Sequence, residues 1–456
     1  MIRSTIISSF ILMLCHSVGA QVYFPVPVIG DPERFTTGIT RTMNLLQTST
    51  RQNSNEVRIM VYGQSISQQD WWKEVKQHLD SSYPEARIIF INKAIGGFSA
   101  ERLIHTVDND VVSFYPDLIL FHDYGNEEQY EKIIQVIRSR TTSEIAIQTD
   151  HMAMQNQDWH DIHSSQWLPM LAKKYDLALI DIRATWKKYL EENELDIKDL
   201  LKDGVHLNDH GNYLMASLIK NYFNSAGQAQ SPNLHVTYLQ AGNDFQMKNK
   251  RIELPIHGNR VDLIWKKNVY TRNKLTIRVD EKNPTTIKEC YYYTRPATDT
   301  AGFFLRRIGQ PLAITLQNQP IEEEWKMTIT WSDSIEQEVG FRVEGSVSGE
   351  DGVGRSDSLF TSVSGRILIH PASWFRAKEF AGFPWLKPGD VLKWRVKRTC
   401  ASEVAADTSG ATTILQGIEN RPHALSLSGK GLRNLSGIRI YRPPLNFTPA
   451  LHKKEY

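Results

Sequence analysis

The sequence has few cysteines, no long hydrophobic run and no excess of charge of one sign. Three cysteines among 456 residues exclude the disulfide framework that holds small secreted domains together. No run reaches the ~20 apolar residues that a membrane-spanning helix needs, so we expect no integral membrane segment. The 53 Lys and Arg against 51 Asp and Glu give a net charge of +2 without a block of either sign. This pattern indicates neither nucleic acid nor an anionic membrane surface as a partner.

The amino-terminal segment has the pattern of a secretory signal. Arg3 precedes an apolar run at residues 6–14, and the small residues at 17–20 suit a signal peptidase. We therefore predict a signal peptide at 1–20, a lead-in segment at 21–54, and a secreted or periplasmic protein. Cleavage leaves Cys290 and Cys400 as the cysteines of the mature chain. They either pair in an oxidising compartment or stay two buried thiols, and the sequence leaves both open.

Residues 55–226 alternate between strand-like and helix-like segments. Short runs rich in Ile, Leu and Val predict strands buried on both faces: Val57–Tyr62, Arg87–Ile91, Leu118–Phe121, Ile145–Ile147 and Leu177–Ile180. Amphipathic stretches predict the intervening and final helices: Gln69–Leu79, Ala100–Phe114, Glu127–Arg138, Trp167–Tyr175 and Asp209–Phe223. This alternation predicts an α/β fold with a parallel sheet, and the carboxyl ends of its strands should meet at one edge.

The pattern changes in residues 232–447 to short runs in which apolar and polar residues alternate, as at 275–280 and 392–396. Gly and Pro separate these runs. We predict an all-β region, a sandwich or jelly roll, built as one unit or as two smaller β domains. Its many aromatic residues either form a sugar-stacking surface or, as is commoner in β-sandwiches, fill the core.

Residues suited to acyl-transfer chemistry follow the predicted strands. Ser65 stands after the first strand, where Gly63 permits a tight turn before the next helix. The other candidates are Gly96 and Gly97 after the second strand, His122, Tyr124 and Asn126 after the third, His151 after the fourth, and Asp203 and His206 before the last helix. Each has a simpler explanation, such as a helix cap or a loop ion pair. Their joint placement at one sheet edge favours an active site.

The order of these motifs resembles that of the SGNH (GDSL-type) serine esterases, which have a three-layer α/β/α fold. The resemblance lies in Gly63-Gln-Ser65, the stretch from Asn92 to Gly97, Tyr124-Gly-Asn-Glu127, and Asp203-Gly-Val-His206. Gln64 stands where the family usually has Asp, which is similar to the Gly-Gln-Ser turn of some carbohydrate O-acetylesterases. Tyr124 and Glu127 stand where the family usually has Gly and Asp, so the third motif departs from the pattern.

A serine hydroxyl is a weak nucleophile at neutral pH and needs a base, for which His206 is the candidate and Asp203 its orienting partner. The resemblance implies an oxyanion hole made by the N–H groups of Ser65 and Gly97 and the side chain of Asn126. Gly96 is the near alternative to Gly97, and His122 is the rival of Asn126. Candidate pocket residues are Gln64, Gly96, His122, Tyr124 and His151. The reaction requires no metal or organic cofactor.

Three functions fit this pattern, and the expected partner of an enzyme with it is a carbohydrate or another small-molecule ester substrate. The first is a secreted serine esterase that removes O-acetyl groups from a carbohydrate through an acyl-serine intermediate. The second is a lipid or aryl ester hydrolase on the same fold, and the third is a catalytically weak glycan-binding protein. His151, His160 and His163 with Asp150 and Asp161 match no close metal-ligand spacing, so we interpret them as pocket wall or surface.

Overall fold

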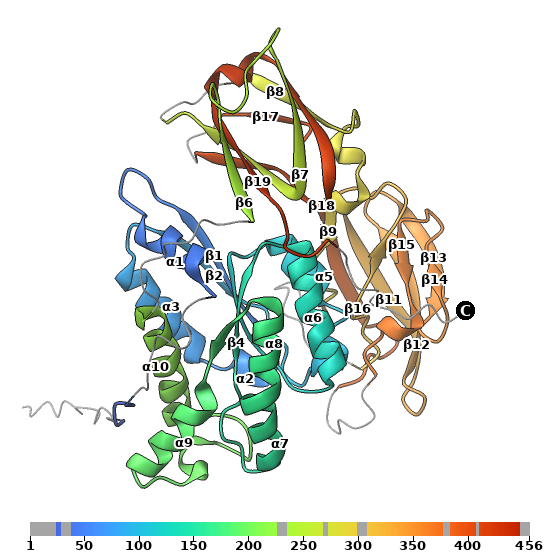
Figure 1. Cartoon of the computed structure of the whole chain (residues 1–456). Coiled ribbons are helices and arrows are strands. Elements are labelled where there is room, and N and C mark those ends of the chain that lie inside the picture. Colours follow the sequence, from blue (N-terminus) through green and yellow to red (C-terminus); the bar gives the residue numbers. More distant parts are fainter. Residues whose placement is uncertain are drawn as a thin grey trace, which may run out of the picture.

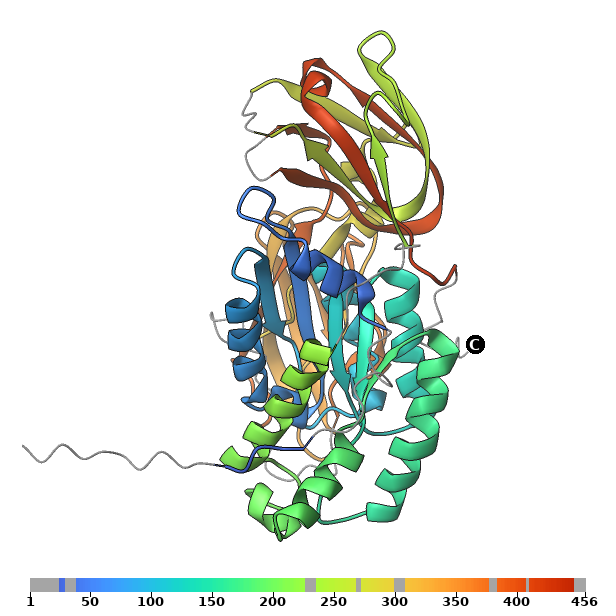
Figure 2. The same ribbon diagram turned by 60° about the vertical axis from the view of Figure 1, so that its left-hand side comes forward.

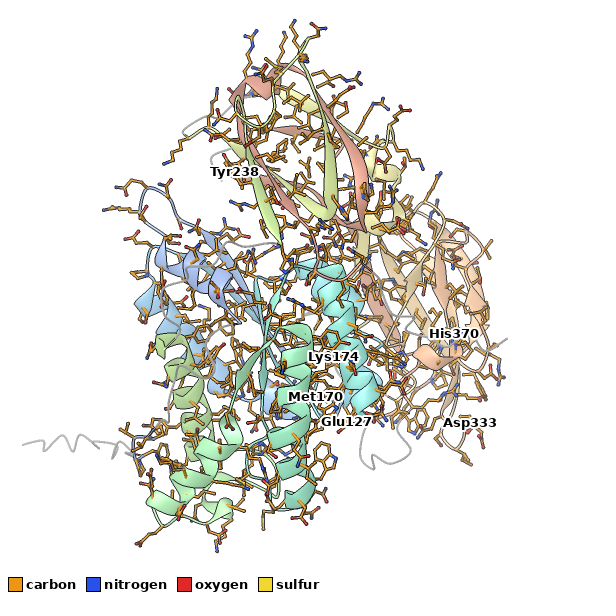
Figure 3. All side chains as sticks on the ribbon, in the orientation of Figure 1. Glu127, Met170, Lys174, Tyr238, Asp333 and His370 are labelled. Carbon is orange, nitrogen blue, oxygen red and sulfur yellow. The ribbon has the colours of Figure 1, made fainter. Side chains whose placement is uncertain are left out.

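The computed structural model describes residues 24–28, 38–225, 235–267, 272–298, 308–376, 384–406 and 410–446. The predicted signal peptide at 1–20 lies outside them. Figure 1 shows an α/β domain, coloured blue to green, and two β units, coloured yellow to red. Figure 3 labels exposed side chains on each part, with Met170 on the α/β domain, Tyr238 on the first β unit and His370 on the second. Within the described ranges, no helix has the length and apolar character to cross a bilayer.

A five-stranded sheet, all parallel, forms the centre of the α/β domain, which confirms the predicted fold class. The strands stand in the order β2-β1-β3-β4-β5. Their bounds are β1 Glu56–Gly63, β2 Arg87–Asn92, β3 Leu118–His122, β4 Glu144–Gln148 and β5 Ala178–Ile180. Gly63 pairs with His122 at the ends of β1 and β3. The carboxyl ends of the five strands therefore share one side of the sheet, called the carboxyl edge below.

Helices cover both faces of this sheet (Figure 2). One face packs against α1 (Thr40–Gln47), α3 (Trp71–Ser82), α9 (Ile182–Glu192) and α10 (Asp209–Ser225). The other packs against α4 (Ala100–Leu103), α5 (Val107–Phe114), α6 (Glu127–Arg140) and α8 (Leu168–Tyr175). The short helix α2 (Ser65–Gln68) follows β1, and α7 (Gln157–Ile162) enters α8 through a π-helical turn, His163–Trp167. A 3₁₀ turn, Ile197–Leu200, precedes α10.

Several elements differ from the sequence prediction, since α1 and α7 were not among the predicted helices. The stretch predicted as one helix, Ala100–Phe114, is two helices, because the Thr106 hydroxyl donates to the Leu103 carbonyl and competes with the backbone there. Helix α9 was not predicted, although Asp181 is a visible N-cap whose Oδ1 accepts the Ala184 N–H at 3.1 Å.

The predicted carboxyl-terminal β-sheet architecture is confirmed, and it forms two units. The first is a six-stranded sheet in the order β17-β8-β18-β7-β19-β6. Its strands are β6 Val236–Gln240, β7 Arg251–Trp265, β8 Lys274–Val279, β17 Glu403–Ala405, β18 Ala411–Ser428 and β19 Leu435–Tyr441. Its 3₁₀ turns are Pro284–Thr286, Lys288–Cys290 and Lys430–Asn434.

The second β unit pairs a five-stranded sheet, β13-β12-β11-β16-β9, with a three-stranded one, β10-β15-β14. The five strands are β9 Tyr291–Tyr293, β11 Glu323–Asp333, β12 Glu338–Gly345, β13 Gly349–Arg355 and β16 Val391–Arg398. The other three are β10 Thr315–Leu316, β14 Phe360–Thr361 and β15 Ile367–Ile369, followed by a 3₁₀ turn at Pro371–Ser373. Trp325, Trp374 and Trp394 are buried between the sheets, as expected for core aromatics.

The second β unit is packed against the α/β domain. Its residues Ile308, Leu312 and Phe375 belong to the same buried cluster as the side chains of α4 and α5. Arg295 adds a buried ion pair with Asp110 of α5. An uncompensated charge at this depth is costly, so the pairing fixes how the two parts meet.

Candidate active site

Ser65 stands in the turn between β1 and α2, at the carboxyl edge. Gly63 has φ 137°, and a Cβ added to it would lie 1.8 Å from the His122 carbonyl oxygen, so this turn requires glycine. Gln64 caps α2, because its Oε1 accepts the Ile66 N–H at 3.2 Å. The same oxygen accepts the Ser65 hydroxyl at 2.6 Å. The Ser65 N–H has no hydrogen-bond partner among the described residues.

Gln64 and His122 are in contact beneath Ser65. Gln64 Nε2 lies 3.1 Å from His122 Nδ1, and both side chains are buried. The Gln64 oxygen is fixed by the backbone N–H it accepts, so Nε2 donates and His122 Nδ1 accepts. His122 therefore carries its proton on Nε2. Because His122 Nδ1 is used in this way, the ring orients the Gln64 amide.

The two glycines after β2 differ in what their N–H groups do. Gly96 donates its N–H to Gln68 Oε1 at 3.1 Å. Gly97 has φ 76°, and its N–H has no partner in the part of the chain that the structure describes. Of the two glycines, Gly97 therefore offers the backbone donor that an oxyanion hole needs.

Asn126 is the N-cap of α6. Its Oδ1 accepts the Gln129 N–H at 3.1 Å, and its own N–H donates to Glu101 Oε1 at 2.8 Å. These bonds orient the side-chain amide. The Nδ2 group has no partner among the residues described, and the side chain is exposed. Asn126 thus combines the structural role of a cap with an available donor.

Asp203 and His206 form a dyad on the loop before α10. Asp203 Oδ1 accepts the N–H groups of Val205 at 2.8 Å and His206 at 2.7 Å, and Oδ2 accepts His206 Nδ1 at 2.9 Å. Burial opposes ionisation of Asp203, but these bonds outweigh it and lower the pKa of Asp203 to about 2. The ionised carboxylate fixes the proton of His206 on Nδ1. His206 Nε2 is left as the basic nitrogen, on a side chain that is 37% exposed.

Gln69 connects this loop to the helix that begins with Ser65. Gln69 Nε2 donates to the Leu207 carbonyl at 3.0 Å, and its Oε1 accepts the Leu207 N–H at 3.0 Å. Among the described residues no hydrogen bond joins Ser65 to His206, since the serine hydroxyl donates to Gln64. The amide of Gln69 nevertheless holds the residue next to His206 against the end of α2. The sequence analysis missed Gln69, and no motif in the sequence distinguishes it.

His151 supports the same loop from the other side. Its Nε2–H donates to the Val205 carbonyl at 2.7 Å, so Nδ1 is the acceptor that faces the Tyr124 hydroxyl at 3.4 Å. Burial lowers the pKa of His151 to about 3, so the ring is neutral at ordinary pH. The side chain is fully buried. His151 is therefore placed to hold the dyad loop, with Tyr124 as its second partner.

Asp150, which follows β4, is buried among three histidines. Its Oδ2 accepts His160 Nδ1 at 2.7 Å and His163 Nδ1 at 3.3 Å, and its Oδ1 lies 3.3 Å from His122 Nε2. The approach of His122 is close but poorly aligned for a hydrogen bond. Burial alone would raise the pKa of Asp150, but the three rings hold it well below its ordinary value. No described group of three or more such side chains is arranged to hold a metal ion.

Asp123 is a further buried carboxyl that the sequence analysis missed. It follows His122 directly, and its Oδ1 accepts the Tyr124 N–H at 2.9 Å. Its Oδ2 is buried without a partner among the described residues. Burial raises the pKa of Asp123 well above its ordinary value.

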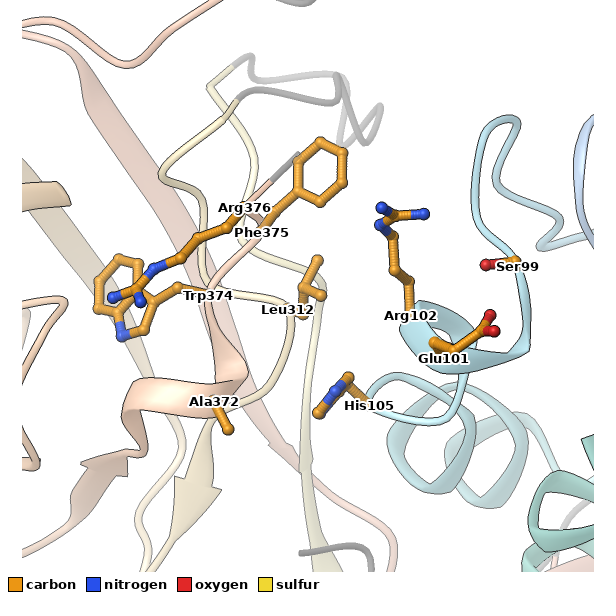
Figure 4. Close-up of a pocket in the computed structure, with 9 residues that line it drawn as sticks. All are labelled: Ser99, Glu101, Arg102, His105, Leu312, Ala372, Trp374, Phe375 and Arg376. Carbon is orange, nitrogen blue, oxygen red and sulfur yellow. The ribbon is translucent and has the colours of Figure 1, made fainter. Parts of the chain in front are cut away.

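A cavity of about 460 Å³ opens between α4 and the second β unit (Figure 4). Its lining comes from both parts: Ser99, Glu101, Arg102 and His105 on one side, and Leu312, Ala372, Trp374, Phe375 and Arg376 on the other. The cavity adjoins the candidate site, because Glu101 also accepts the Asn126 N–H. Charged groups and aromatic rings thus line one space beside the carboxyl edge.

The predicted site residues therefore fall into three contact groups. Ser65, Gln64 and His122 are linked to one another, Asp203 is linked to His206, and His151 links Tyr124 to the dyad loop. Gly97 and Asn126 present donors from the neighbouring loops at the same edge. Their catalytic roles stay predictions.

No protein-family model matches this sequence, and no curated protein matches it. Among solved structures, a two-domain esterase active on acetylated mannans is 13% identical, with a TM-score of 0.37, over 91% of this chain and 99% of that one. An acetylxylan esterase from Geobacillus stearothermophilus, a catalytic mutant, is 17% identical, with a TM-score of 0.33, over 39% of this chain and 97% of that one. The acetyl xylan esterase AlAXEase is 23% identical, with a TM-score of 0.33, over 36% and 98%.

Proposed function

We propose that this protein is a serine esterase with Ser65 as nucleophile, His206 as general base and Asp203 as the residue that orients it. One observation supports the proposal most strongly. Ser65 lies in a turn that only glycine allows, and His206 is oriented by the ionised Asp203 carboxylate. Gln69 hydrogen-bonds the loop of His206 to the end of the helix that begins with Ser65. A weak nucleophile and an oriented base are the two parts that acyl transfer needs.

In the proposed mechanism the Ser65 hydroxyl leaves Gln64 Oε1 and turns toward His206 Nε2 when an ester binds. A hydrogen bond between a catalytic serine and its base is often absent before the substrate binds. Ser65 attacks the carbonyl carbon, His206 takes its proton and then gives it to the leaving alcohol. Water activated by His206 releases the acid from the acyl-serine. The N–H groups of Ser65 and Gly97, with the Asn126 amide, receive the charge on the carbonyl oxygen.

We further propose that the substrate is an O-acetylated carbohydrate and that the protein is exported. The cavity beside Asn126 supports the carbohydrate class, because Glu101, Arg102 and Arg376 offer charged hydrogen-bonding groups that suit a sugar chain better than a lipid tail. The amino-terminal signal supports export, and the Gln64 turn resembles that of carbohydrate O-acetylesterases.

The experiment that tests the esterase compares an aryl acetate with an aryl ester of a long acid. The exported protein should cleave the acetate faster, and Ser65→Ala should abolish both activities. Ser81→Ala, a change on the exposed side of α3, is the matched control and should retain them. Acetate cleavage that persists in Ser65→Ala would reject the serine mechanism.

The carbohydrate step has its own test in the cavity. Arg102→Ala removes a charged lining group that has no part in the proposed chemistry. On an acetylated polysaccharide KM should rise about tenfold, while cleavage of the aryl acetate stays unchanged. Equal KM values for the variant and the unmodified chain on the polysaccharide would remove this cavity from the substrate path.

A further inference from the structure

Cys290 and Cys400 stand at the two crossings between the first and the second β unit. Cys290 ends the 3₁₀ turn Lys288–Cys290, immediately before β9 begins at Tyr291. Cys400 follows β16, which ends at Arg398. Strands β6 to β8 of the first unit precede this excursion, and β17 to β19 follow it. The second β unit is therefore an insertion whose entry and exit each carry one cysteine.

Strand pairing brings these two points together. Strand β9 is antiparallel to β16, with Tyr291 opposite Arg398. Beyond this pair, the Thr399 N–H donates to the Cys290 carbonyl at 2.7 Å, and the Thr399 hydroxyl donates to the same oxygen at 2.8 Å. The backbone around the two cysteines is thus held in register before any bond between their sulfurs exists.

The two thiols are in direct contact inside the core. Both cysteines belong to the buried cluster of the first β unit. Cys290 is 0% exposed and Cys400 is 8% exposed. Both are free thiols in the structure, and the proximity of Cys400 together with burial raises the pKa of Cys290. Cys400 Sγ also donates to the Pro284 carbonyl at 3.2 Å. Such thiols are poor nucleophiles once the protein has folded, so oxidation has to occur while the chain folds.

We propose that Cys290 and Cys400 form a structural disulfide in the exported protein and that this bond closes the neck of the inserted second β unit. The oxidant is a protein of the dithiol–disulfide class. The Cys290 thiolate attacks its disulfide and forms a mixed disulfide, releasing one thiolate. The Cys400 thiolate then attacks Cys290 Sγ, forms the Sγ–Sγ bond and releases the second thiolate. The chain loses two electrons and two protons, and the disulfide of the oxidant gains them and becomes a dithiol.

A disulfide at this position should stabilise the folded protein strongly. Residues 291–399 would become a closed loop in the unfolded chain, and long loops gain the most from closure. The second β unit also lines the cavity beside the candidate site, so a bond at its neck fixes one wall of that cavity. The inference does not rest on the proposed esterase activity.

The direct test uses the full chain recovered after export, without reductant. Thiol titration in denaturant should find no free thiol, and the intact mass should be lower by two hydrogen atoms than after reduction. Digestion without reductant should yield one peptide pair that joins Cys290 to Cys400. Two free thiols in the exported protein would overturn the proposal, as would either cysteine joined to a different thiol.

A stability measurement provides the second test. Reductant should lower the melting temperature of the unmodified protein by on the order of 10 °C, given the size of the loop. The double variant Cys290→Ser/Cys400→Ser is the control and should show no response to reductant. If that variant does not fold, the thiol titration and peptide map of the unmodified chain decide. A melting temperature that reductant leaves unchanged would contradict a structural role.

Discussion

Two groupings of aspartate with histidine lie at the same carboxyl edge and differ in their exposure to solvent. The dyad of Asp203 and His206 is on a surface loop, and half of the Asp203 side chain is exposed, at 51%. The cluster of Asp150 with His122, His160 and His163 is buried, and Asp150 is 0% exposed. Both carboxylates are ionised, since hydrogen bonds lower both pKa values.

The difference lies in what remains available after each carboxylate has been satisfied. In the dyad, Asp203 uses one imidazole nitrogen, and His206 Nε2 has no hydrogen-bond partner among the described residues. In the cluster, three imidazole rings surround the Asp150 carboxylate, and the second nitrogen of His122 accepts a hydrogen bond from Gln64. A carboxylate beside a histidine is therefore not enough to make a base. Exposure separates the dyad from the cluster, because the His206 side chain is 37% exposed, whereas those of His122, His160 and His163 are 1%, 10% and 2% exposed.

The largest expected effect comes from breaking the dyad. His206→Asn should lower kcat on an aryl acetate about 10⁴-fold or more, because the general base is lost. The melting temperature should change little, since the side chain is partly exposed. His78→Asn, a change on the surface of α3, is the control and should leave kcat unchanged. A stable His206→Asn protein with near-normal kcat would transfer the role of base to another group.

Breaking the cluster should affect stability instead of chemistry. Asp150→Asn keeps the shape but replaces the buried charge that three imidazole rings face. We expect the free energy of unfolding to fall by about 3 kcal/mol, measured in denaturant, because buried donors lose their charged acceptor. The folded fraction should retain its kcat. A fall in kcat as large as that of His206→Asn, at unchanged stability, would make the cluster part of the chemistry.

Gln69→Ala removes the hydrogen bonds that hold the dyad loop but leaves Asp203 and His206 unchanged. Loss of both bonds to Leu207 should lower kcat about 10- to 100-fold, since small misplacements of a base are costly. KM and the melting temperature should stay close to those of the unmodified protein. Gln77→Ala, on the exposed side of α3, is the matched control. If only the melting temperature changed, Gln69 would stabilise the fold without positioning the base.

His151→Gln tests the neutral histidine behind the loop. The pKa of His151 is lowered in the folded protein from 6.5 to about 3, so between these values the unfolded chain binds a proton that the folded one does not. Stability contributed by the neutral ring is thus present above pH 6.5 and declines as pH falls. The decline should reach about 2 kcal/mol by pH 5. Glutamine can keep both hydrogen bonds without titrating, so denaturant curves of the variant should depend less on pH. Equal pH dependence in both proteins would contradict the assignment.

The sequence predicted what local patterns encode and missed what the tertiary structure assembles. The strands of the α/β domain were visible because each is a short apolar run, and Asp203 with His206 because three residues separate them on one loop. Asp150, His160 and His163 were grouped from the sequence but interpreted as pocket wall or surface, whereas the structure buries them around one carboxylate. His122 joins them from the end of β3, and no spacing in the sequence reveals that contact. Gln69 contacts Leu207, which is 138 positions away in the chain, so no local sequence pattern predicts this contact. The predicted helix at 100–114 is interrupted next to Thr106, whose hydroxyl donates to the Leu103 carbonyl, and the amphipathic pattern does not encode that bond.

Covalent labelling with a fluorophosphonate, which reacts with an activated serine, tests most directly whether Ser65 is the nucleophile. We expect one phosphonyl group per chain, located on Ser65 by peptide mapping, and slow or no labelling in His206→Asn. The folded fraction of Asp150→Asn should be labelled normally. Labelling at a serine other than Ser65, or equal rates with and without His206, would contradict the assignment of Ser65 and His206.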